Sequence, residues 1–560
     1  MATITFDDTI YEARDGESVL EVLLRGGANV QSSCRKGACH SCMLRVVHGA
    51  PTHESTRRLR KDFADAGHFL PCVCIPEEDL TLTRPDLSSI TFLAIVADVT
   101  LVGPSIVKLQ LEPETALDWR PGHVVNLFHD GASRSYSITS IAERDYFLEL
   151  HIKRFEGGAL SPWVHDTLQP GELVTISNPA GSCTWREDLS ERHLILVATG
   201  VGAGAMLGVA RDALLGGHEK PVTLLVGATD MASLYLHDEC LQLAAAHENL
   251  TYVGCVSRGE PSDGARAGRV TSHLASAVAS PDETTLILCG NPEMVFESRV
   301  HAVRAGVNRR AIIADPYEPA TPYMPDDSAK IAAIPPEPEL WEALDQGTGL
   351  RAILEDFYQL AYQDERLAPF FHKVTIERAV SKQYEFLADL FSGTRNFFGM
   401  RPFNAHHWMI ISDDLFDYRE ELIEDCARRW GLEEALICRW MAVHEMFRRE
   451  IVKPAERGLM VDGEEQLKQG YSLEVIEVAT ICDACFHEIE EGERARMHRR
   501  TGELFCMSCG GKKTATAHVS WFIKRSTRRR CSPNLIQTIV AIRSIRTLLF
   551  ESRLIQPSTH

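Results

Sequence analysis

The placement of the cysteines is the feature of this sequence that most constrains its folding. The chain has 16 cysteines in 560 residues, and eight of them form two tight groups, one near each end. In a secreted protein such groups would predict disulfides, but this spacing indicates metal ligation in a reducing compartment. Each group is therefore expected to organise a small domain around a metal centre.

The first group has the spacing of a two-iron cluster. It reads Cys34-x4-Cys39-x2-Cys42, and the later segment "FLPCVCIPEEDLTL" offers Cys72 and Cys74 as a fourth ligand. This is the pattern of a plant-type 2Fe-2S cluster, whereas structural zinc, the alternative, favours paired C-x2-C knuckles. Residues 1–85 resemble the ferredoxin family, which implies a fourth ligand four residues before a proline. That selects Cys72, and Cys74 is expected to be a small buried residue beside the cluster.

The length and the net charge of the chain limit how many domains it has and which classes of function it can serve. A chain of this length predicts about three to five domains. Acidic residues outnumber basic ones by 78 to 58, a net charge of −20 that argues against nucleic-acid binding. The acidic N-terminal stretch does not read as a signal peptide. The longest apolar run, 194–210, holds four glycines and suits a strand, a loop and a helix better than a membrane span. We expect a cytoplasmic protein without a transmembrane span.

Residues 90–320 begin with short β-like runs and change near residue 190 to alternating β and α segments, which predicts an antiparallel β-barrel and then a doubly wound α/β domain. The segment "RSYSITS" resembles the flavin motif of the ferredoxin–NAD(P)H reductase family. The resemblance implies that Arg134 pairs with the FAD pyrophosphate, Tyr136 lies against the isoalloxazine ring and Ser137 meets the flavin edge. "GGALS" resembles that family's second phosphate-binding turn and ends in Ser161.

Two glycine motifs predict the nucleotide site. "LILVATGVGAGAM" reads as a buried strand, a glycine-rich turn and a helix whose N-terminal N–H groups bind a pyrophosphate. "LILCGNPEM" resembles the nicotinamide motif of the same family, although Ala205 and Thr229 stand where the family usually has proline and arginine. "SRGEP" offers no basic cluster for a 2′-phosphate, so NADH is favoured over NADPH. The candidate NAD(P)H residues are Thr199, Gly200, Gly202, Cys289, Gly290 and Pro292.

The order ferredoxin, flavin domain and nicotinamide domain resembles the reductase components of aromatic-ring oxygenases. Such a unit converts a two-electron hydride into single electrons, because the flavin accepts two and the cluster passes them on one at a time. A proline-rich linker is expected to follow.

Beyond the linker, apolar residues recur at helical spacing, as in Leu350, Ile353, Leu354 and Phe357. Gln383 interrupts a second stripe, either as an edge residue or as a hydrogen-bond donor. "FYQLAYQDERLAPFF", "KQYEFL" and "AHHWMIIS" resemble the truncated (two-over-two) haemoglobins. This resemblance implies that His406 ligates a haem b iron and that His407 is a neighbour. It also implies that Tyr358 and Gln383 donate to bound O2, with Phe357 and Phe386 as apolar walls. Ser392-Gly393 replaces the family's Gly-Gly.

The second cysteine group, Cys482-x2-Cys485-x20-Cys506-x2-Cys509, predicts a four-thiolate site of the zinc-ribbon kind, with mononuclear iron as the rival. Structural zinc serves folding or partner docking. The basic tail that follows predicts either an amphipathic helix that touches a membrane or a protein partner, or an irregular segment.

The sequence therefore predicts a multidomain protein. Its domains are expected at 1–88 (β-grasp ferredoxin, α+β), 89–188 (antiparallel FAD barrel), 189–318 (α/β NAD(P) domain), 319–340 (linker), 341–458 (all-α globin), 478–513 (four-cysteine zinc module) and 514–560 (basic tail). The simplest function is a self-contained NAD(P)H-driven globin that converts nitric oxide and O2 to nitrate. The alternatives are a haem-based O2 or nitric oxide sensor, and a reductase for a separate oxygenase.

Overall fold

The structure is a computed structural model, and it divides into two compact units, residues 1–469 and 470–560. The predicted basic tail and the predicted ligands Cys34 and Cys39 lie outside the residues that it describes. Those residues are 2–13, 17–28, 30, 37, 40–57, 59, 61–86, 90–318, 327–371, 374–394, 397, 401–453, 457–461, 464–466, 471–476, 480–482, 485, 487–490, 492–498 and 504–509.

The N-terminal domain is a five-stranded sheet that packs against a short helix, as predicted for a β-grasp ferredoxin. Its strands have the order β2-β1-β5-β3-β4, and β1 and β5 run parallel. Helix α1 begins with a capping box between Ser18 and Glu21 and buries its apolar residues in the domain core. The elements are β1 (Thr3–Phe6), β2 (Thr9–Glu12), α1 (Val19–Arg25), β3 (Leu44–His48), α2 (His53–Thr56), α3 (Lys61–Asp65), β4 (His68–Phe69) and β5 (Leu80–Thr83).

The next domain is the predicted antiparallel barrel. Its sheet has the order β10-β7-β6-β11-β8-β9, and a bridge between Ile138 and Leu150 joins the two outer strands. The β8–β9 hairpin turns through Asp130 and Gly131, which both have positive φ (46° and 72°), as a two-residue hairpin turn requires. The strands are β6 (Thr91–Gly103), β7 (Ile106–Pro113), β8 (Val124–His129), β9 (Ala132–Ser137), β10 (Leu148–Lys153) and β11 (Leu173–Ser177).

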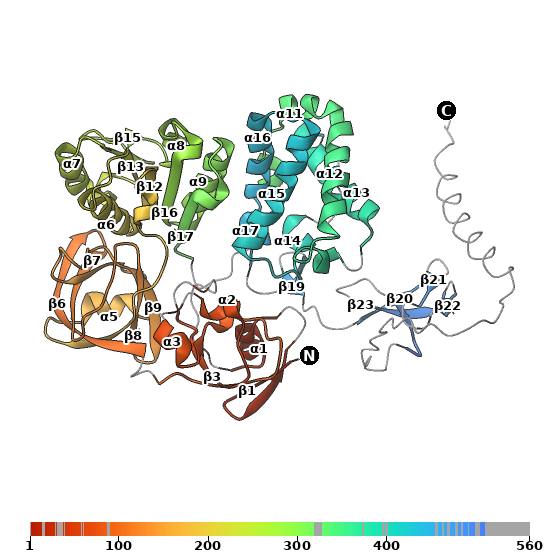
Figure 1. Ribbon diagram of the computed structural model, residues 1–560, viewed down its shortest axis with the longest axis horizontal. Coiled ribbons are helices and arrows are strands. Elements are labelled where there is room, and N and C mark those ends of the chain that lie inside the picture. The colour runs from red at the N-terminus through yellow and green to blue at the C-terminus, as the bar shows by residue number, and fades with distance from the viewer. Residues whose placement is uncertain are drawn as a thin grey trace. The chain divides into compact units, whose positions relative to one another are not determined.

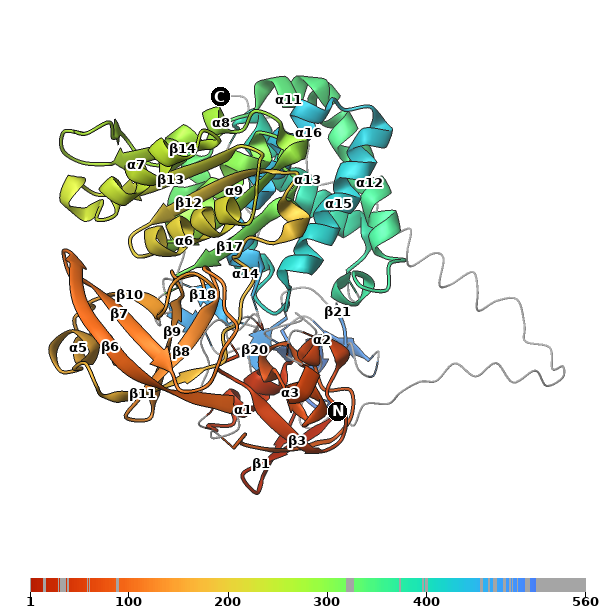
Figure 2. The ribbon, with the colours of Figure 1, turned by 60° about the vertical axis from the view of Figure 1, so that its left-hand side comes forward.

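The nicotinamide domain is a parallel, doubly wound sheet (Figures 1 and 2). Its strand order is β15-β14-β13-β12-β16-β17, so the chain reverses direction across the sheet between β12 and β16. Helices α6 and α7 pack on one face, and α8 and α9 pack on the other. The elements are β12 (His193–Thr199), α6 (Gly202–Leu215), β13 (Val222–Ala228), α7 (His237–Ala246), β14 (Leu250–Val256), β15 (Arg266–Ala267), α8 (Thr271–Ala277), β16 (Thr284–Gly290), α9 (Pro292–Arg304) and β17 (Ile312–Pro316).

The segment after residue 337 is helical, as predicted for a globin. The two predicted apolar stripes lie on α12 and α13, which pack against each other, and Ser412 caps α15 by accepting a hydrogen bond from Leu415 N. Two helices close the segment, because the chain turns at Met446 and Phe447 between α16 and α17. The helices are α11 (Pro338–Ala343), α12 (Thr348–Ala361), α13 (Ile376–Ser392), α14 (Pro402–Ala405), α15 (Asp413–Trp430), α16 (Glu434–Glu445) and α17 (Arg448–Ile451).

Part of the predicted linker is folded. Residues Asp327–Ala333 form helix α10, and the globin helices already begin at Pro338. Lys330 of α10 pairs with the buried carboxylate of Glu450 and lies over the ring of Phe447. A buried carboxylate requires a cationic partner, and this requirement ties the segment to the globin more tightly than its proline content suggested.

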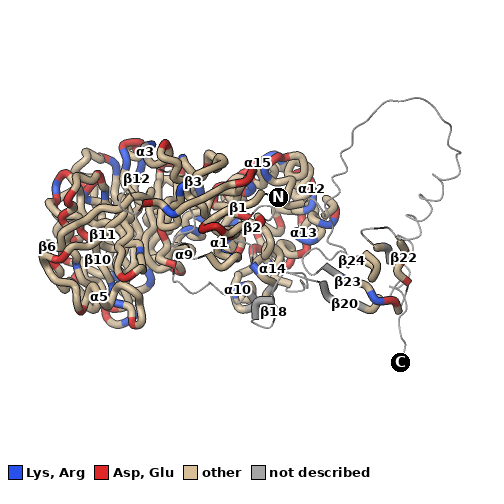
Figure 3. Tube along the Cα trace, turned by 90° about the horizontal axis from the view of Figure 1, so that it is seen from below, with Lys and Arg blue, Asp and Glu red and all other residues tan. Residues whose placement is uncertain are grey.

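The second unit contains a small sheet ordered β20-β23-β24 (Tyr471–Val475, Arg494–His498 and Leu504–Cys506) and the hairpin β21–β22 (Thr480–Ile481 and Glu488–Ile489). In the first unit, acidic and basic residues are interspersed along the described chain (Figure 3). Within the described residues, no helix combines the length and the apolar character that crossing a membrane requires.

Candidate functional site

Four polar side chains from three strands meet beside the predicted flavin motif. Ser137 ends β9, Cys289 lies near the end of β16, and Asp315 and Tyr317 lie at the end of β17 and just beyond it. The Tyr317 hydroxyl lies 3.0 Å from Ser137 Oγ and accepts a hydrogen bond of 3.0 Å from the Cys289 thiol. Ser137 Oγ also lies 3.5 Å from Asp315 Oδ2. The predicted flavin residue Ser137 and nicotinamide residue Cys289 therefore share one site.

Burial keeps two groups of this site neutral. It raises the pKa of the Cys289 thiol, and it raises the pKa of the Tyr317 phenol well above its ordinary value. Both groups therefore stay protonated at neutral pH and act as uncharged hydrogen-bond donors. The sequence prediction missed Asp315 and Tyr317 as site residues. The available signal was their place at the carboxyl end of a parallel strand, where ligands of such sheets bind.

The predicted pyrophosphate loop lies at the reversal point of the sheet. Gly200 has φ +59°, with no atom within 4 Å of the position a Cβ would occupy, and α6 begins directly after it without a side-chain cap. A Cβ on Gly202 would lie 2.5 Å from Cys289 O, and one on Gly290 would lie 2.5 Å from Thr199 O. The open helix N-terminus and these two glycines form the cradle that a dinucleotide pyrophosphate requires.

The remaining flavin candidates lie around the barrel. Arg134 is exposed, and it donates one hydrogen bond of 2.7 Å to the carbonyl of Ser133. Burial raises the pKa of Tyr136 to about 12, so its hydroxyl stays protonated. Ser161 begins the short helix α5 (Ser161–Asp166), and its hydroxyl accepts a hydrogen bond of 3.0 Å from Phe155 N. An exposed guanidinium and an ordered hydroxyl fit the phosphate-binding roles predicted for Arg134 and Ser161.

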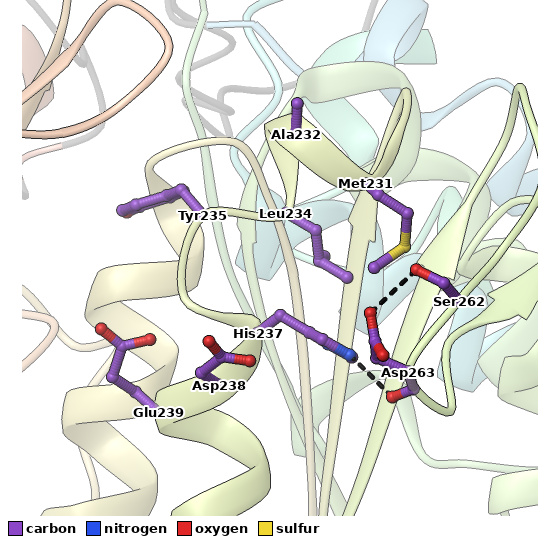
Figure 4. Close-up of a pocket in the computed structure, with 9 residues that line it drawn as sticks. All are labelled: Met231, Ala232, Leu234, Tyr235, His237, Asp238, Glu239, Ser262 and Asp263. Atoms are coloured by element: carbon purple, nitrogen blue, oxygen red, sulfur yellow. Dashed lines mark hydrogen bonds between the residues drawn. The ribbon is translucent and has the colours of Figure 1, made fainter.

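A pocket of about 360 Å³ opens at the carboxyl ends of β13 and β14 (Figure 4). Inside the pocket, His237 Nε2 lies 3.0 Å from the backbone carbonyl oxygen of Asp263. The Ser262 hydroxyl donates a hydrogen bond of 2.9 Å to the carboxylate of Asp263. Three of its residues are acidic and none is lysine or arginine, so it offers no positive charge to a phosphate. The lining residues are Met231, Ala232, Leu234, Tyr235, His237, Asp238, Glu239, Ser262 and Asp263.

Of the four predicted iron–sulfur ligands, Cys42 and Cys72 are described, and both are buried. Gly37 adopts the left-handed conformation with φ +70°, and Cys74 is fully buried in the domain core. Next to Cys42, Ser41 donates a hydrogen bond of 2.8 Å to the side-chain oxygen of Asn126. That contact joins the predicted cluster loop to the flavin barrel.

Asn126 itself belongs to the flavin side of this contact. It lies on β8 and is buried. Ser135 Oγ donates a hydrogen bond of 2.8 Å to Asn126 Oδ1, the same oxygen that accepts from Ser41. Ser135 stands between the predicted flavin residues Arg134 and Tyr136. One asparagine oxygen therefore connects the flavin strand with the residue beside a cluster ligand, a link that no sequence motif indicated.

His406, the predicted iron ligand, makes a hydrogen bond through one of its ring nitrogens. Its Nδ1 lies 2.8 Å from the carbonyl of Pro402, an arrangement that holds the proton on Nδ1 and leaves a lone pair on Nε2, as the predicted role requires. Burial lowers the pKa of His406 to about 4 and outweighs the opposing effect of the Pro402 hydrogen bond. The imidazole is therefore neutral, which is the form that binds iron. His407 makes a similar bond, with its Nδ1 2.6 Å from the carbonyl of Asn404.

The two predicted distal residues are directly bonded. Tyr358 on α12 donates a hydrogen bond of 2.6 Å to Gln383 Oε1 on α13. Since the amide oxygen is engaged, the amide N–H groups of Gln383 remain as donors. Burial raises the pKa of Tyr358 to about 12. Phe386 contacts Phe397 and Phe447 in edge-to-face pairs, which supplies the predicted apolar wall.

Arg419 on α15 is a further charged residue of this region that sequence reasoning missed. Its guanidinium lies 5.2 Å from the centroid of the Phe357 ring and pairs with the buried carboxylate of Glu420. Its positive charge acts to lower the pKa of both Tyr358 and His406, although burial is the larger influence on each. It follows that a cation lies close to the predicted haem site. No pattern in the sequence distinguished it from the many surface arginines.

The four cysteines of the second unit converge. Their sulfurs all lie within 4.8 Å of one another, and Cys485 Sγ is 3.8 Å from Cys506 Sγ. Four sulfurs at about 2.3 Å from one zinc ion form a tetrahedron with edges of about 3.8 Å, so the group fits zinc. Hydrogen bonds from the Ser508 hydroxyl and the Cys509 N–H lower the pKa of Cys506 to about 6, which favours the metal-binding thiolate. The structure thus joins Cys482, Cys485, Cys506 and Cys509 in one site.

Comparison with known families divides the chain in the same order. Four family models match: a 2Fe-2S iron-sulfur cluster binding domain (residues 4–77), an oxidoreductase FAD-binding domain (96–185), an oxidoreductase NAD-binding domain (196–299) and a bacterial-like globin (339–447). These matches support 2Fe-2S, FAD, NAD(P)H and haem as cofactors.

Individual relatives match the first half of the chain. The reductase component of the naphthalene 1,2-dioxygenase system of Pseudomonas putida is 27% identical over 317 residues, which cover 54% of this chain and 94% of that protein. The reductase subunit of an Amycolatopsis aromatic O-demethylase is 29% identical and covers 55% and 96%. The crystal structure of an Amycolatopsis cytochrome P450 reductase matches with 26% identity and a TM-score of 0.42, covering 57% of this chain and all of that one.

The chain therefore combines the 2Fe-2S, FAD-binding and NAD-binding domains of an NAD(P)H-dependent flavin and iron–sulfur oxidoreductase with a bacterial-like globin, and it is similar to the reductase components of ring-oxygenase systems.

Proposed function

We propose that the chain is a nitric oxide dioxygenase that draws its electrons from NADH. The observation that carries the proposal is the Tyr358–Gln383 pair, which lies in a globin joined to a complete reductase. A globin that only stores O2 needs no hydride donor. One that consumes O2 must be reduced again after every turnover, and the fused reductase meets that need.

The proposed reaction balances with one NADH. Two molecules of nitric oxide and two of O2 take up the two electrons of the hydride and leave two nitrate ions, NAD⁺ and a proton. The reductase accepts the pair of electrons at the flavin and delivers them singly through the iron–sulfur cluster. Haem supplies the iron at which O2 and nitric oxide react.

The chain's own residues have defined tasks in this scheme. The neutral His406 would hold the haem iron through Nε2, with its proton kept on Nδ1 by the Pro402 carbonyl. Gln383, oriented by Tyr358, would present its amide N–H groups to the ligand and slow its release. At the other end, Cys289, Tyr317 and Ser137 would position the nicotinamide and the flavin edge without adding charge.

The pocket at the ends of β13 and β14 supports NADH as the donor. Its lining contains Asp238, Glu239 and Asp263, and a 2′-phosphate placed against these carboxylates would be repelled. We therefore expect kcat/KM to be higher for NADH than for NADPH.

An anaerobic titration of the holoprotein with NADH, followed at the haem absorbance bands, is the first test. The proposal requires haem reduction within the time of flavin turnover, and then NADH-dependent nitric oxide consumption with nitrate as the product. If flavin and cluster are reduced while the haem stays ferric, the globin is not the acceptor.

The second candidate function is a reductase for a separate oxygenase, with the globin as an accessory. The relatives that match residues of the first half favour it, because several are the reductase components of oxygenase systems. An added oxygenase that is reduced faster than the haem of the same chain would establish this alternative.

A further inference from the structure

The globin and the nicotinamide domain share one continuous core. Helix α9 of the nicotinamide domain packs against α16 of the globin, and the apolar residues of both domains belong to a single buried cluster. Near the end of α9, a Cβ on Gly306 would lie 3.8 Å from Cys438 Sγ of α16. A buried core of this kind makes a fixed junction between two domains and not a passing contact.

Arginine–carboxylate pairs surround this core. Arg299 Nε on α9 donates a hydrogen bond of 2.6 Å to the Glu445 carboxylate on α16, and both side chains are less than one-tenth exposed. Because burying a charge costs free energy, each of these groups needs its partner while the domains are packed, and losing either one would leave an uncompensated buried charge. Further pairs across the junction include Arg304–Glu337, Arg309–Glu424, Arg309–Asp417, Arg310–Glu421 and Arg310–Asp414.

One pair of contacts reaches the hydride-transfer site itself. Arg449 of the globin helix α17 contacts Glu293 at 2.5 Å and Glu318 at 2.8 Å, and it lies over the ring of Phe296. The Arg449 side chain is only 10% exposed. A guanidinium held between two carboxylates and an aromatic ring is a fixed element and not a mobile surface charge.

Glu293 and Glu318, the two carboxylates that Arg449 contacts, each stand next to a residue of the predicted site. Glu293 follows Pro292, a predicted nicotinamide residue, and its backbone N–H donates a hydrogen bond of 2.8 Å to the side-chain oxygen of Asn291. Glu318 follows Tyr317. The backbone N–H of Tyr317 donates a hydrogen bond of 2.8 Å to the carbonyl of Gly290, and its hydroxyl contacts Ser137 and Cys289. Arg449 therefore holds together the two segments between which the nicotinamide must bind.

We infer that the globin is part of the hydride-transfer site: Arg449 is a positioning residue that fixes the Asn291–Glu293 and Tyr317–Glu318 segments in the arrangement that binds NADH. The reductase thus depends on the globin for its own first step, whatever ligand the haem meets. Loss of the Arg449 contacts leaves both segments to be ordered by NADH, which raises KM.

The test is the substitution Arg449→Gln in the full-length holoprotein. Ferricyanide takes electrons from the reduced flavin, so its NADH-dependent reduction reports hydride transfer without involving the haem. We expect the KM for NADH to rise by about fivefold to tenfold, the net size of one lost hydrogen bond, while flavin, iron and haem contents stay at wild-type values. Arg449→Lys should restore part of the loss.

Arg310→Gln is the matched control. It removes the ion pairs with Glu421 and Asp414 at the same junction, neither of which involves either segment, and it should leave the KM for NADH unchanged. Glu318→Gln should reproduce the Arg449→Gln effect, and the double variant should be no worse than either single variant. Because Glu318 is partly exposed, the gap between wild type and Arg449→Gln should narrow as salt is added.

Two results would overturn the inference. One is an unchanged KM for NADH in both Arg449→Gln and Glu318→Gln. The other is an equal rise in Arg310→Gln, which would mean that any weakening of the junction suffices. If Arg449→Gln loses its haem or fails to fold, Glu318→Gln alone decides the outcome, because its carboxylate lies outside the globin.

Discussion

Replacing Tyr358 by phenylalanine should speed the release of O2 from the globin through its effect on Gln383. In the structure the phenol donates 2.6 Å to Gln383 Oε1, which leaves the amide N–H groups to face a ligand. Without the phenol, the amide of Gln383 loses the hydrogen bond that fixes its orientation. Hydrogen bonds to a partly charged ligand contribute about 1.5–3 kcal/mol, so we expect O2 dissociation to accelerate by about tenfold or more.

The same geometry predicts that the two residues are coupled. If Tyr358 acts by orienting Gln383, then Tyr358→Phe should have little effect once Gln383 is replaced by leucine. The coupling free energy in a double-mutant cycle should then be about 1.4 kcal/mol or more, or about tenfold or more in rate, which is nearly the whole Tyr358→Phe effect. Removing a hydroxyl creates only a small void in this buried site, and Phe357 can serve as a neighbouring packing control.

Stopped-flow displacement of O2 by carbon monoxide measures these rates directly in the wild type, the two single variants and the double variant. The haem absorbance of each variant verifies that the cofactor is retained. Equal dissociation rates in the wild type and Tyr358→Phe would refute the reasoning. So would effects that multiply in the double variant, since independent donors and not an oriented pair would then be at work.

Three further predictions concern other parts of the structure. Ser41→Ala removes the hydrogen bond to Asn126 and should slow reduction of the iron–sulfur cluster several-fold in a stopped-flow experiment, while the rate of flavin bleaching stays unchanged. A cluster-reduction rate in the variant equal to that of the wild type would contradict this prediction. Cys485→Ser should abolish stoichiometric zinc in metal analysis of the purified protein, and retention of one full zinc would disprove the four-thiolate site. Burial opposes ionisation of Glu149, but its hydrogen bond and charge contact with His151, aided by Lys108 and Gln110, prevail and lower its pKa to about 2. Because this pKa lies below the ordinary value of 4.5, ionised Glu149 stabilises the folded protein above pH 4.5, and that stabilisation is lost as the pH falls towards 2. The midpoint of thermal unfolding should therefore depend less on pH between 3 and 6 in Glu149→Gln than in the wild type.

Local patterns were sufficient to predict the order of the domains, which the four family models reproduce. Cysteine spacing, glycine-rich turns after buried strands and helical apolar stripes each depend on residues close together in the chain, and the physical rules that relate them to structure are local. Thus "LILVATGVGAGAM" predicted the strand, turn and helix of β12 and α6. The paired knuckles of Cys482 and Cys506 predicted a single cluster for the same reason.

Contacts between distant segments could not be predicted in this way. Tyr317 meets Ser137 across 180 residues, and Arg449 meets Glu293 across 156. No periodicity in the chain relates such pairs, because their distance depends on how whole domains pack. The folded α10 within the predicted linker is a further instance, since Lys330 is required there only by the buried Glu450.

The sequence by itself indicated which cofactors this protein carries, because each predicted cofactor site is marked by one or more short motifs of residues close together in the chain. The tertiary structure decided how the modules are connected. It placed Asn126 between the flavin strand and the cluster loop, and it set Arg449 of the globin against the nicotinamide site. These links depend on burial and on ion pairs between surfaces, which exist only once the domains have folded and packed together.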